Sequence, residues 1–161
     1  GNTGLASSYL RYFIADLAKC DGLEPRHVLS KSKCLSADVT AAYDPGYASA
    51  FEAGNSCYLN CGIGIAKYTG SRGKGGCNDA SAEFLGEVRR LFDKNKVLWQ
   101  IGELGKVDQG GGGTVALEVA ALNADVIDVG VPVLSMHAPW EVVSKLDVYM
   151  TYKGIKAFLE Q

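Results

Sequence analysis

Apolar residues recur every three or four positions in several stretches of the chain, which is the spacing of an amphipathic helix. The predicted helices cover residues 5–19, 78–94, 114–122 and 145–160. Gly22 and Pro25 are expected to end the first helix and to lead into a polar connection. Asn78 or Asp79 is expected to cap the second, because a side-chain oxygen there can accept a hydrogen bond from a free backbone N–H of the first turn.

Short apolar runs between the predicted helices indicate strands. They cover residues 33–39, 58–68, 97–101 and 126–131. Residues 47–56 and 103–113 show no clear period and are expected to form loops. Because strands and helices alternate, the pattern predicts a three-layer α/β/α sandwich with a mostly parallel or mixed sheet. No internal repeat, low-complexity tract or linker is present, so residues 1–161 are expected to belong to a single domain.

Composition and charge narrow the class of protein without changing this fold. Of the 161 residues, 47% are apolar and 21% are charged, as in an ordinary globular domain. The net charge of -2 provides no basic surface for nucleic acid, and no apolar run approaches the roughly 20 residues that span a bilayer. We therefore expect neither nucleic acid nor a membrane as a partner. The five cysteines are odd in number and scattered, which predicts reduced thiols and a cytoplasmic location.

Two candidate metal ligands follow apolar strands. Asp38 stands at the end of the run that begins at residue 33, and His137 lies on a turn beyond the run 126–131. Sites in α/β proteins lie past the carboxyl ends of strands, and a carboxylate with an imidazole is a ligand set that zinc or manganese accepts. The same residues also suit structural roles, Asp38 as a turn cap and His137 as a hydrogen-bonded core histidine, because two ligands alone do not make a site.

Four consecutive glycines occupy positions 110–113 and allow the backbone to approach a ligand or a strand closely. They lack the lysine and serine or threonine that end a P-loop, so a phosphate would be bound only by amides at the start of the next helix. A tight turn or a sheet crossing explains the same glycines. Lys67, Arg72 and Lys74 form a basic cluster that suits either an anionic substrate group or a solvated surface.

Four segments, in order, resemble the aminopeptidase I (aspartyl aminopeptidase) family of metallo-aminopeptidases. They are LSADVTAAYDP, IAKYTGSRGKGGCNDASAEF, ELGKVDQGGGGT and VPVLSMHAPWEV, and the resemblance extends over essentially the whole chain. It implies a zinc-peptidase-like fold and a hydrolase that removes N-terminal residues from peptides with a two-metal-activated water. It also implies two zinc ions per site, with manganese or cobalt as substitutes, and large homo-oligomers, typically dodecamers.

The resemblance also implies roles for particular side chains. Asp38 matches a metal-binding aspartate and His137 matches the last histidine ligand, one on each of two metals. Lys67 matches a lysine near the substrate, and Lys74 falls near the position of a substrate-contacting tyrosine.

The glycine loop and the residue at position 41 concern which peptide the site would accept. Gly112 and Gly113 belong to the loop that the resemblance makes a wall of the pocket for the first residue of the peptide. Ala41 stands where aspartyl members of the family carry a substrate-contacting histidine. A preference for acidic N-terminal residues is therefore not carried over to this chain.

The remaining ligands and the catalytic base of the family match positions before Gly1. We therefore expect residues 1–161 to be the C-terminal part of a catalytic domain that is incomplete at its N-terminus. The remainder of that domain is an expected partner of this chain. No catalytic base is expected within the chain, and the isolated chain is expected to be inactive. Two alternatives remain: a non-catalytic α/β assembly module in which Asp38 and His137 are structural, and a phosphate-ligand binder that uses the glycines at 110–113.

Overall fold

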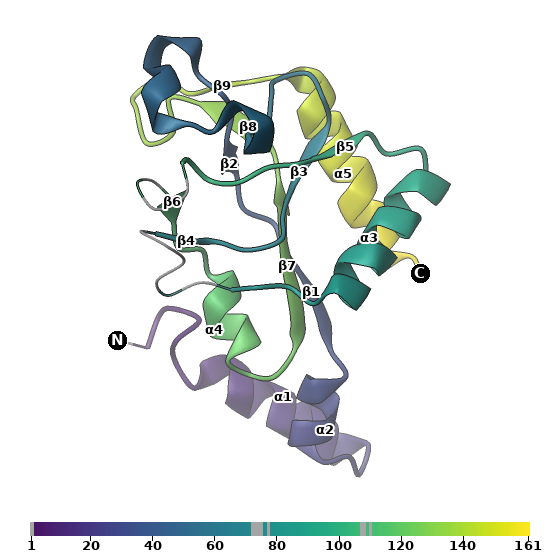
Figure 1. Cartoon of the computed structure of the whole chain (residues 1–161). Helices are drawn as coiled ribbons and strands as arrows, with labels where there is room; N and C mark the ends of the chain where they lie inside the picture. Colours follow the sequence, from purple (N-terminus) through teal and green to yellow (C-terminus); the bar gives the residue numbers. More distant parts are fainter. Residues whose placement is uncertain (1, 72–75, 77, 107–108, 110) are drawn as a thin grey trace.

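The centre of the fold is a four-stranded sheet with helices on both faces (Figure 1). The computed structural model describes residues 2–71, 76, 78–106, 109 and 111–161. Its helices are α1 (Tyr9–Cys20), α2 (Pro25–Ser30), α3 (Ala82–Lys94), α4 (Ala116–Ala120) and α5 (Lys145–Leu159), with 3-10 helices η1 (Pro45–Ala50) and η2 (Ala53–Asn55). Its strands are β1 (Lys33–Ser36), β2 (Thr40–Ala41), β3 (Ile63–Ala66), β4 (Gly70–Ser71), β5 (Trp99–Ile101), β6 (Gly111–Gly112), β7 (Asp125–Gly130), β8 (Pro132–Leu134) and β9 (Val142–Val143).

The central sheet has the order β1-β7-β3-β5 and is mixed. β1 runs parallel to β7 and β3 runs parallel to β5, whereas β3 and β7 are antiparallel. Helices α3 and α5 cover one face and α4 lies against the other, as Figure 1 shows. The prediction of an α/β fold with a mixed sheet between two helical layers is confirmed.

The core lies between the central sheet and the pair α3 and α5. The face of α3 that carries Phe84, Val88 and Phe92 is buried, since these residues recur at helical spacing and turn toward β3 and β7. Strand β3 is buried on both faces, as expected for a strand between two neighbours and under helices. The core therefore fixes β7, the strand that reaches the candidate site.

Two neighbouring segments leave the central sheet together and enter a second sheet. β1 is followed by β2, β7 is followed by β8, and the second sheet has the order β2-β8-β9. The N–H of Thr40 donates to the carbonyl of Val131 at 3.1 Å, which joins the two segments at the crossing. The crossing lies at the carboxyl ends of β1 and β7, and the candidate site is built around it.

The structure confirms Gly22 as the end of the first helix, since Gly22 follows the C-cap of α1 with φ of +66°, and it differs from the other predicted boundary signals. Pro25 begins α2 rather than ending a helix, because proline at the first helical position has no N–H that needs a partner. The cap of α3 is Ser81, whose hydroxyl accepts a hydrogen bond from the N–H of Phe84 at 3.2 Å. Asn78 instead donates its side-chain amide to the carbonyl of Val126, and Asp79 pairs with Lys67, so the predicted cap was wrong.

The predicted strands and loops are longer than the elements that form. Residues 33–39 break after Ser36, residues 58–68 are a strand only over β3, and residues 47–56 hold parts of η1 and η2 instead of a plain loop. Glycine 62, with φ of +97°, lies against the carbonyl of Leu98, and this close approach precedes β3.

No helix within the described residues has both the length and the apolar character needed to cross a bilayer.

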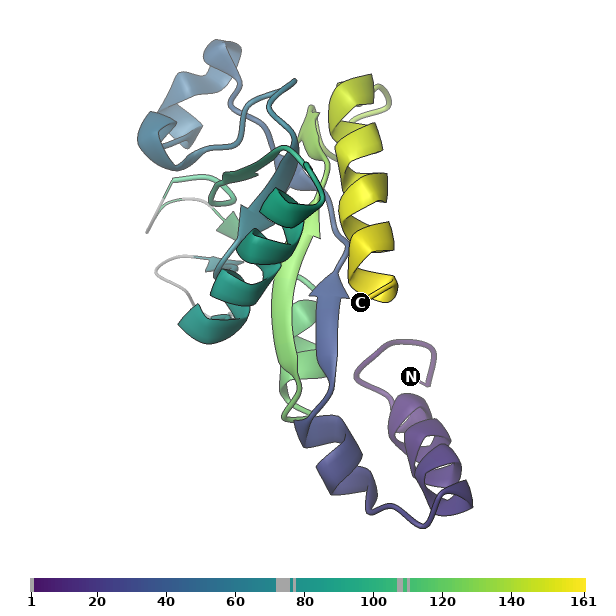
Figure 2. The ribbon, with the colours of Figure 1, turned by 90° about the vertical axis from the view of Figure 1, so that its right-hand side faces the viewer.

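Helices α1 and α5 expose much of their apolar surface. Tyr9 and Tyr12 of α1 are 74% and 68% exposed, since α1 packs mainly against α2, and the two helices extend beyond the sheet in Figure 2. In α5, Tyr149 and Leu159 are exposed, whereas Met150 packs against the core. The amphipathic pattern correctly predicted both helices, but Ala18 is the buried residue of α1, and the large apolar side chains Tyr9 and Tyr12 stay exposed.

Candidate functional site

Asp38 lies at the crossing between the two sheets. It follows β1 and precedes β2, and its side chain is exposed. Its carboxylate oxygen Oδ1 accepts a hydrogen bond from the N–H of Val39 at 2.8 Å, and its own N–H donates to the carbonyl of Ser36 at 3.0 Å. Gly130 at the end of β7 lies directly behind it, because a Cβ on Gly130 would be 1.3 Å from the Asp38 carbonyl oxygen. Close packing of two backbones thus holds Asp38 in place.

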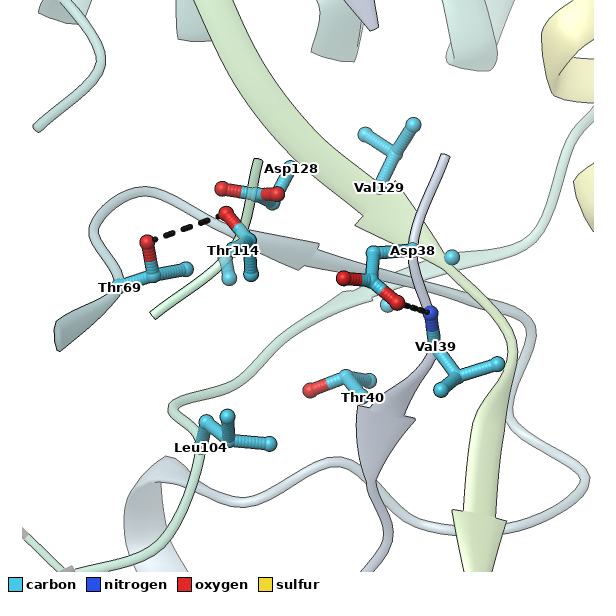
Figure 3. Close-up of a pocket in the computed structure, with 11 residues that line it drawn as sticks. Asp38, Val39, Thr40, Thr69, Leu104, Thr114, Asp128 and Val129 are labelled. Carbon is cyan, nitrogen blue, oxygen red and sulfur yellow. Dashed lines mark hydrogen bonds between the residues drawn. The ribbon is translucent and has the colours of Figure 1, made fainter. Parts of the chain in front are cut away.

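A small pocket opens beside Asp38, at the carboxyl end of β7 (Figure 3). Its polar lining consists of Asp38, Thr40, Thr69, Thr114 and Asp128. The hydroxyls of Thr69 and Thr114 are 3.4 Å apart and share a hydrogen bond. Two carboxylates and three hydroxyls therefore converge on one space.

Asp128 is the most unusual member of this group. It lies within β7, opposite Ser36 of β1 and Ala66 of β3, and is 4% exposed. Burial raises the pKa of the Asp128 carboxyl above its ordinary value, the nearby charge of Asp38 adds to the rise, and the hydroxyls of Ser36 and Thr114 oppose it. These hydroxyls are near, yet neither oxygen of Asp128 makes a hydrogen bond of good geometry within the described residues. Asp128 is thus a buried acid without a full set of partners.

His137 lies at the tip of the turn between β8 and β9. It is exposed, its backbone is left-handed with φ of 68°, and its N–H donates to Oε1 of Glu141 at 2.6 Å. Because β2 and β8 are parallel, Asp38 precedes one end of this pair of strands and His137 follows the other end. His137 does not line the Asp38 pocket. The sequence pattern did not anticipate that β8 would follow β7 and lie between β7 and the turn of His137.

A second pocket, of about 240 Å³, lies at the carboxyl ends of β2 and β8. Its lining includes Ala41, Tyr47, Phe51, Val133 and Met136, so it is mainly apolar. The described lining residues carry no basic side chain, and Asp44 is the one carboxylate among them. Met136 is the chain neighbour of His137, so this pocket adjoins the turn that carries the histidine.

Of the predicted substrate-binding residues, Lys67, Gly112 and Gly113 are described, and none of the three lines the pocket that adjoins the His137 turn. Lys67 follows β3 and its ammonium group pairs with the carboxylate of Asp79. Gly112 pairs with Gly70 in the two-stranded sheet of β4 and β6, so the glycine run takes part in sheet pairing. Gly113 is exposed and precedes Thr114 of the Asp38 pocket, while Lys74 falls outside the described residues.

The described residues alone do not assemble a complete metal shell. Among them, no three His, Cys, Asp or Glu side chains are grouped closely enough to hold a metal ion. Asp38 and His137 are both exposed and have the chemistry of zinc ligands, so each fits a metal whose other ligands come from elsewhere. Asp128 was missed by the sequence interpretation. The available signal was an aspartate within the apolar run 126–131.

Comparisons with known proteins show which chains and which solved structures this one resembles. A probable M18 family aminopeptidase 1 from Clostridium acetobutylicum is 51% identical over 163 residues, covering 99% of this chain and 35% of the relative. The crystal structure of aminopeptidase I from Clostridium acetobutylicum has a TM-score of 0.90 at 50% identity and covers 97% of this chain and 34% of that one. The aminopeptidase (M18 family) structure from Thermotoga maritima has a TM-score of 0.93 at 39% identity, with 99% and 36% covered.

The chain spans about a third of the length of these relatives. Residues 1–159 match the family model described as aminopeptidase I zinc metalloprotease (M18). The match covers the crossing, both pockets and the turn of His137. This chain belongs to the aminopeptidase I zinc metalloprotease (M18) family.

Proposed function

We propose that this chain is part of a metal-dependent aminopeptidase that removes N-terminal residues from peptides. The observation that carries the proposal is the family match over residues 1–159, which includes an exposed Asp38 carboxylate at the carboxyl end of β1. In this proposal Asp38 binds one zinc ion, His137 binds a second, and the remaining ligands and the catalytic base come from a preceding segment. The match to the zinc metalloprotease family supports zinc over manganese or cobalt.

The residues of this chain hold and orient the reacting groups. Bound zinc supplies a Lewis acid that polarises the scissile carbonyl. Asp38 presents its carboxylate from a backbone fixed by Gly130, and His137 presents its imidazole from a turn fixed by Glu141. Lys67 and Lys74, with Gly112 and Gly113, are proposed to border the substrate. Lys67 is oriented by its ion pair with Asp79.

The pocket at the carboxyl ends of β2 and β8 is proposed to receive the first side chain of the peptide. Its mainly apolar lining suits an apolar residue, because burial of apolar surface there is favourable. Ala41 in this lining offers no positive charge to an acidic residue. An N-terminal leucine is therefore expected to be preferred to an N-terminal aspartate.

The first test uses the full-length protein that contains this sequence, loaded with zinc. We expect it to cleave a leucine-initiated peptide faster than an aspartate-initiated one, and to lose activity on treatment with a chelator. An N-acetylated copy of the same peptide should resist cleavage, because the enzyme recognises the free amino group. Product release is followed by liquid chromatography. Equal cleavage of the free and acetylated peptides would contradict the aminopeptidase proposal.

The second test uses the 161-residue chain by itself. We expect it to bind zinc weakly and to hydrolyse none of these peptides, because Asp38 and His137 supply one ligand to each metal and no base. Zinc binding is measured by competition with a chromogenic chelator, and turnover by the same chromatographic assay. Turnover by the purified chain would show that its own residues complete the site.

Homo-oligomer formation, typically of twelve subunits, is also proposed, together with a cytoplasmic location. The exposed apolar side chains of α1 and the 86%-exposed Trp140 support assembly, since apolar surface of this kind often marks an interface. Of the two alternatives, an assembly module is compatible with the same surfaces. The phosphate alternative is disfavoured by the pairing of Gly111 and Gly112 with β4, which gives these glycines a structural role.

A further inference from the structure

The pocket between Asp38 and Asp128 contains an acid that the proposed mechanism does not use. Figure 3 shows the two carboxylates on neighbouring segments, with Asp128 beside Thr114. Asp128 comes from the middle of β7 and is 4% exposed, whereas Asp38, which lines the same pocket, is exposed. The order from the interior outward is therefore Asp128, pocket, Asp38.

A buried carboxylate needs hydrogen-bond donors or a positive charge to compensate for the loss of water. Neither oxygen of Asp128 has a well-formed hydrogen bond within the described residues, and the same is true of the buried hydroxyls of Ser36 and Thr40. No lysine, arginine or histidine occurs among the described residues that line the pocket. The carboxylate of Asp128 therefore needs a small hydrogen-bond donor within the pocket.

The size and chemistry of the pocket fit a water molecule as this donor. The cavity volume is about 10 Å³, which corresponds to roughly one water molecule. A water can donate two hydrogen bonds, one to each carboxylate, and accept one from a threonine hydroxyl such as that of Thr40 or Thr114. A peptide side chain or a hydrated metal ion is too large for this space.

We propose that Asp128 is a positioning residue for the metal ligand Asp38, to which it is connected by one water molecule held in this pocket. The inference rests on the proposed function, because it takes Asp38 as a metal ligand. Carboxylates that bind metals are themselves oriented by hydrogen bonds from outside the metal shell, and removal of such a partner weakens metal binding. Asp128 acts in this way from the centre of β7, so the rigidity of the core is transmitted to the ligand.

The test compares Asp128→Asn with the unsubstituted full-length protein. We expect zinc affinity to fall by about 10- to 100-fold, as measured by competition with a chromogenic chelator. The visible absorption spectrum of the cobalt-substituted protein should also change, because Asp38 is reoriented. Thr40→Val removes a hydroxyl that lines the pocket with little change of volume and should weaken zinc binding in the same direction, by about 2- to 10-fold. If Asp128→Asn fails to fold, the zinc affinity of this second variant tests the proposal by itself.

Two further variants separate the possible results. Asp147→Asn is the control, since Asp147 is also a buried acid but accepts hydrogen bonds from the N–H groups of Asn60 and Gly62, away from the pocket. It should lower stability and leave zinc affinity and the cobalt spectrum unchanged. Asp38→Ala is the benchmark, and retention of all bound zinc by this variant would overturn the proposed function itself. Loss of zinc by Asp38→Ala, with unchanged affinity and spectrum in Asp128→Asn and Thr40→Val, would overturn only the role of Asp128. An ion instead of water in a crystal structure of the pocket would also overturn it.

Discussion

Replacing His137 with alanine in the full-length protein is expected to lower aminopeptidase activity by at least about 1,000-fold and to remove about one zinc ion per subunit. The reason is that metal polarisation of the scissile carbonyl contributes several kcal/mol, and about 4 kcal/mol corresponds to about a 1,000-fold change in rate. Activity is followed on the leucine-initiated peptide, and bound zinc is counted by atomic emission on the purified variant.

Two companion variants make this experiment specific to the imidazole. His137 has a left-handed backbone with φ of 68°, which alanine adopts with some strain, whereas asparagine tolerates it well. His137→Asn should therefore lose the same activity and zinc without that strain. His27→Ala replaces the other histidine, which is exposed in α2, and should change neither quantity. Unchanged zinc content and rate in both His137 variants would reject the ligand assignment.

The sequence pattern indicates exposed candidate residues more readily than buried ones. Asp38 and His137 are candidates because each is a residue of metal-binding type that follows an apolar run, a signal that depends only on neighbours in the chain. Asp128 was missed because its importance depends on the register between β7 and β1, which places it opposite Ser36 and behind Asp38. A periodicity argument cannot supply such a register. For the same reason it did not anticipate strand β8 between β7 and the turn of His137.

Helices were predicted where periodicity and packing agree. The residues of α3 recur at helical spacing and are buried, and the prediction was correct except for its cap. Helix α2 has six residues, too few for a period, and its first-turn proline resembles a helix terminator when it is considered alone. The apolar spacing in α1 correctly predicted a helix, but Tyr9 remains exposed, because spacing describes a helix face and does not say what covers it.

Replacing Gly130 with alanine is expected to disrupt the site and destabilise the fold at once. The new Cβ would lie 1.3 Å from the Asp38 carbonyl oxygen, whereas ordinary contact begins at 3.4 Å, so one backbone must move by about 2 Å. Gly130 is paired with Gly64 of β3 within the central sheet, which resists movement of β7. The segment of Asp38 must therefore shift, and a misplacement of about 1 Å at a reacting centre already costs roughly 100-fold in rate.

We expect Gly130→Ala to lower the free energy of unfolding by about 3–5 kcal/mol, measured by urea denaturation of the full-length protein, and to lose zinc and activity. Gly54→Ala is the matched control, because a Cβ on Gly54 meets no atom within 4 Å, and its stability should stay within about 0.5 kcal/mol of the unsubstituted protein. Comparison of the two variants thus distinguishes the general effect of an added methyl group from the effect of a clash between two closely packed backbones. If Gly130→Ala matched Gly54→Ala in both stability and zinc content, the contact between β7 and the Asp38 segment would not be what positions the ligand.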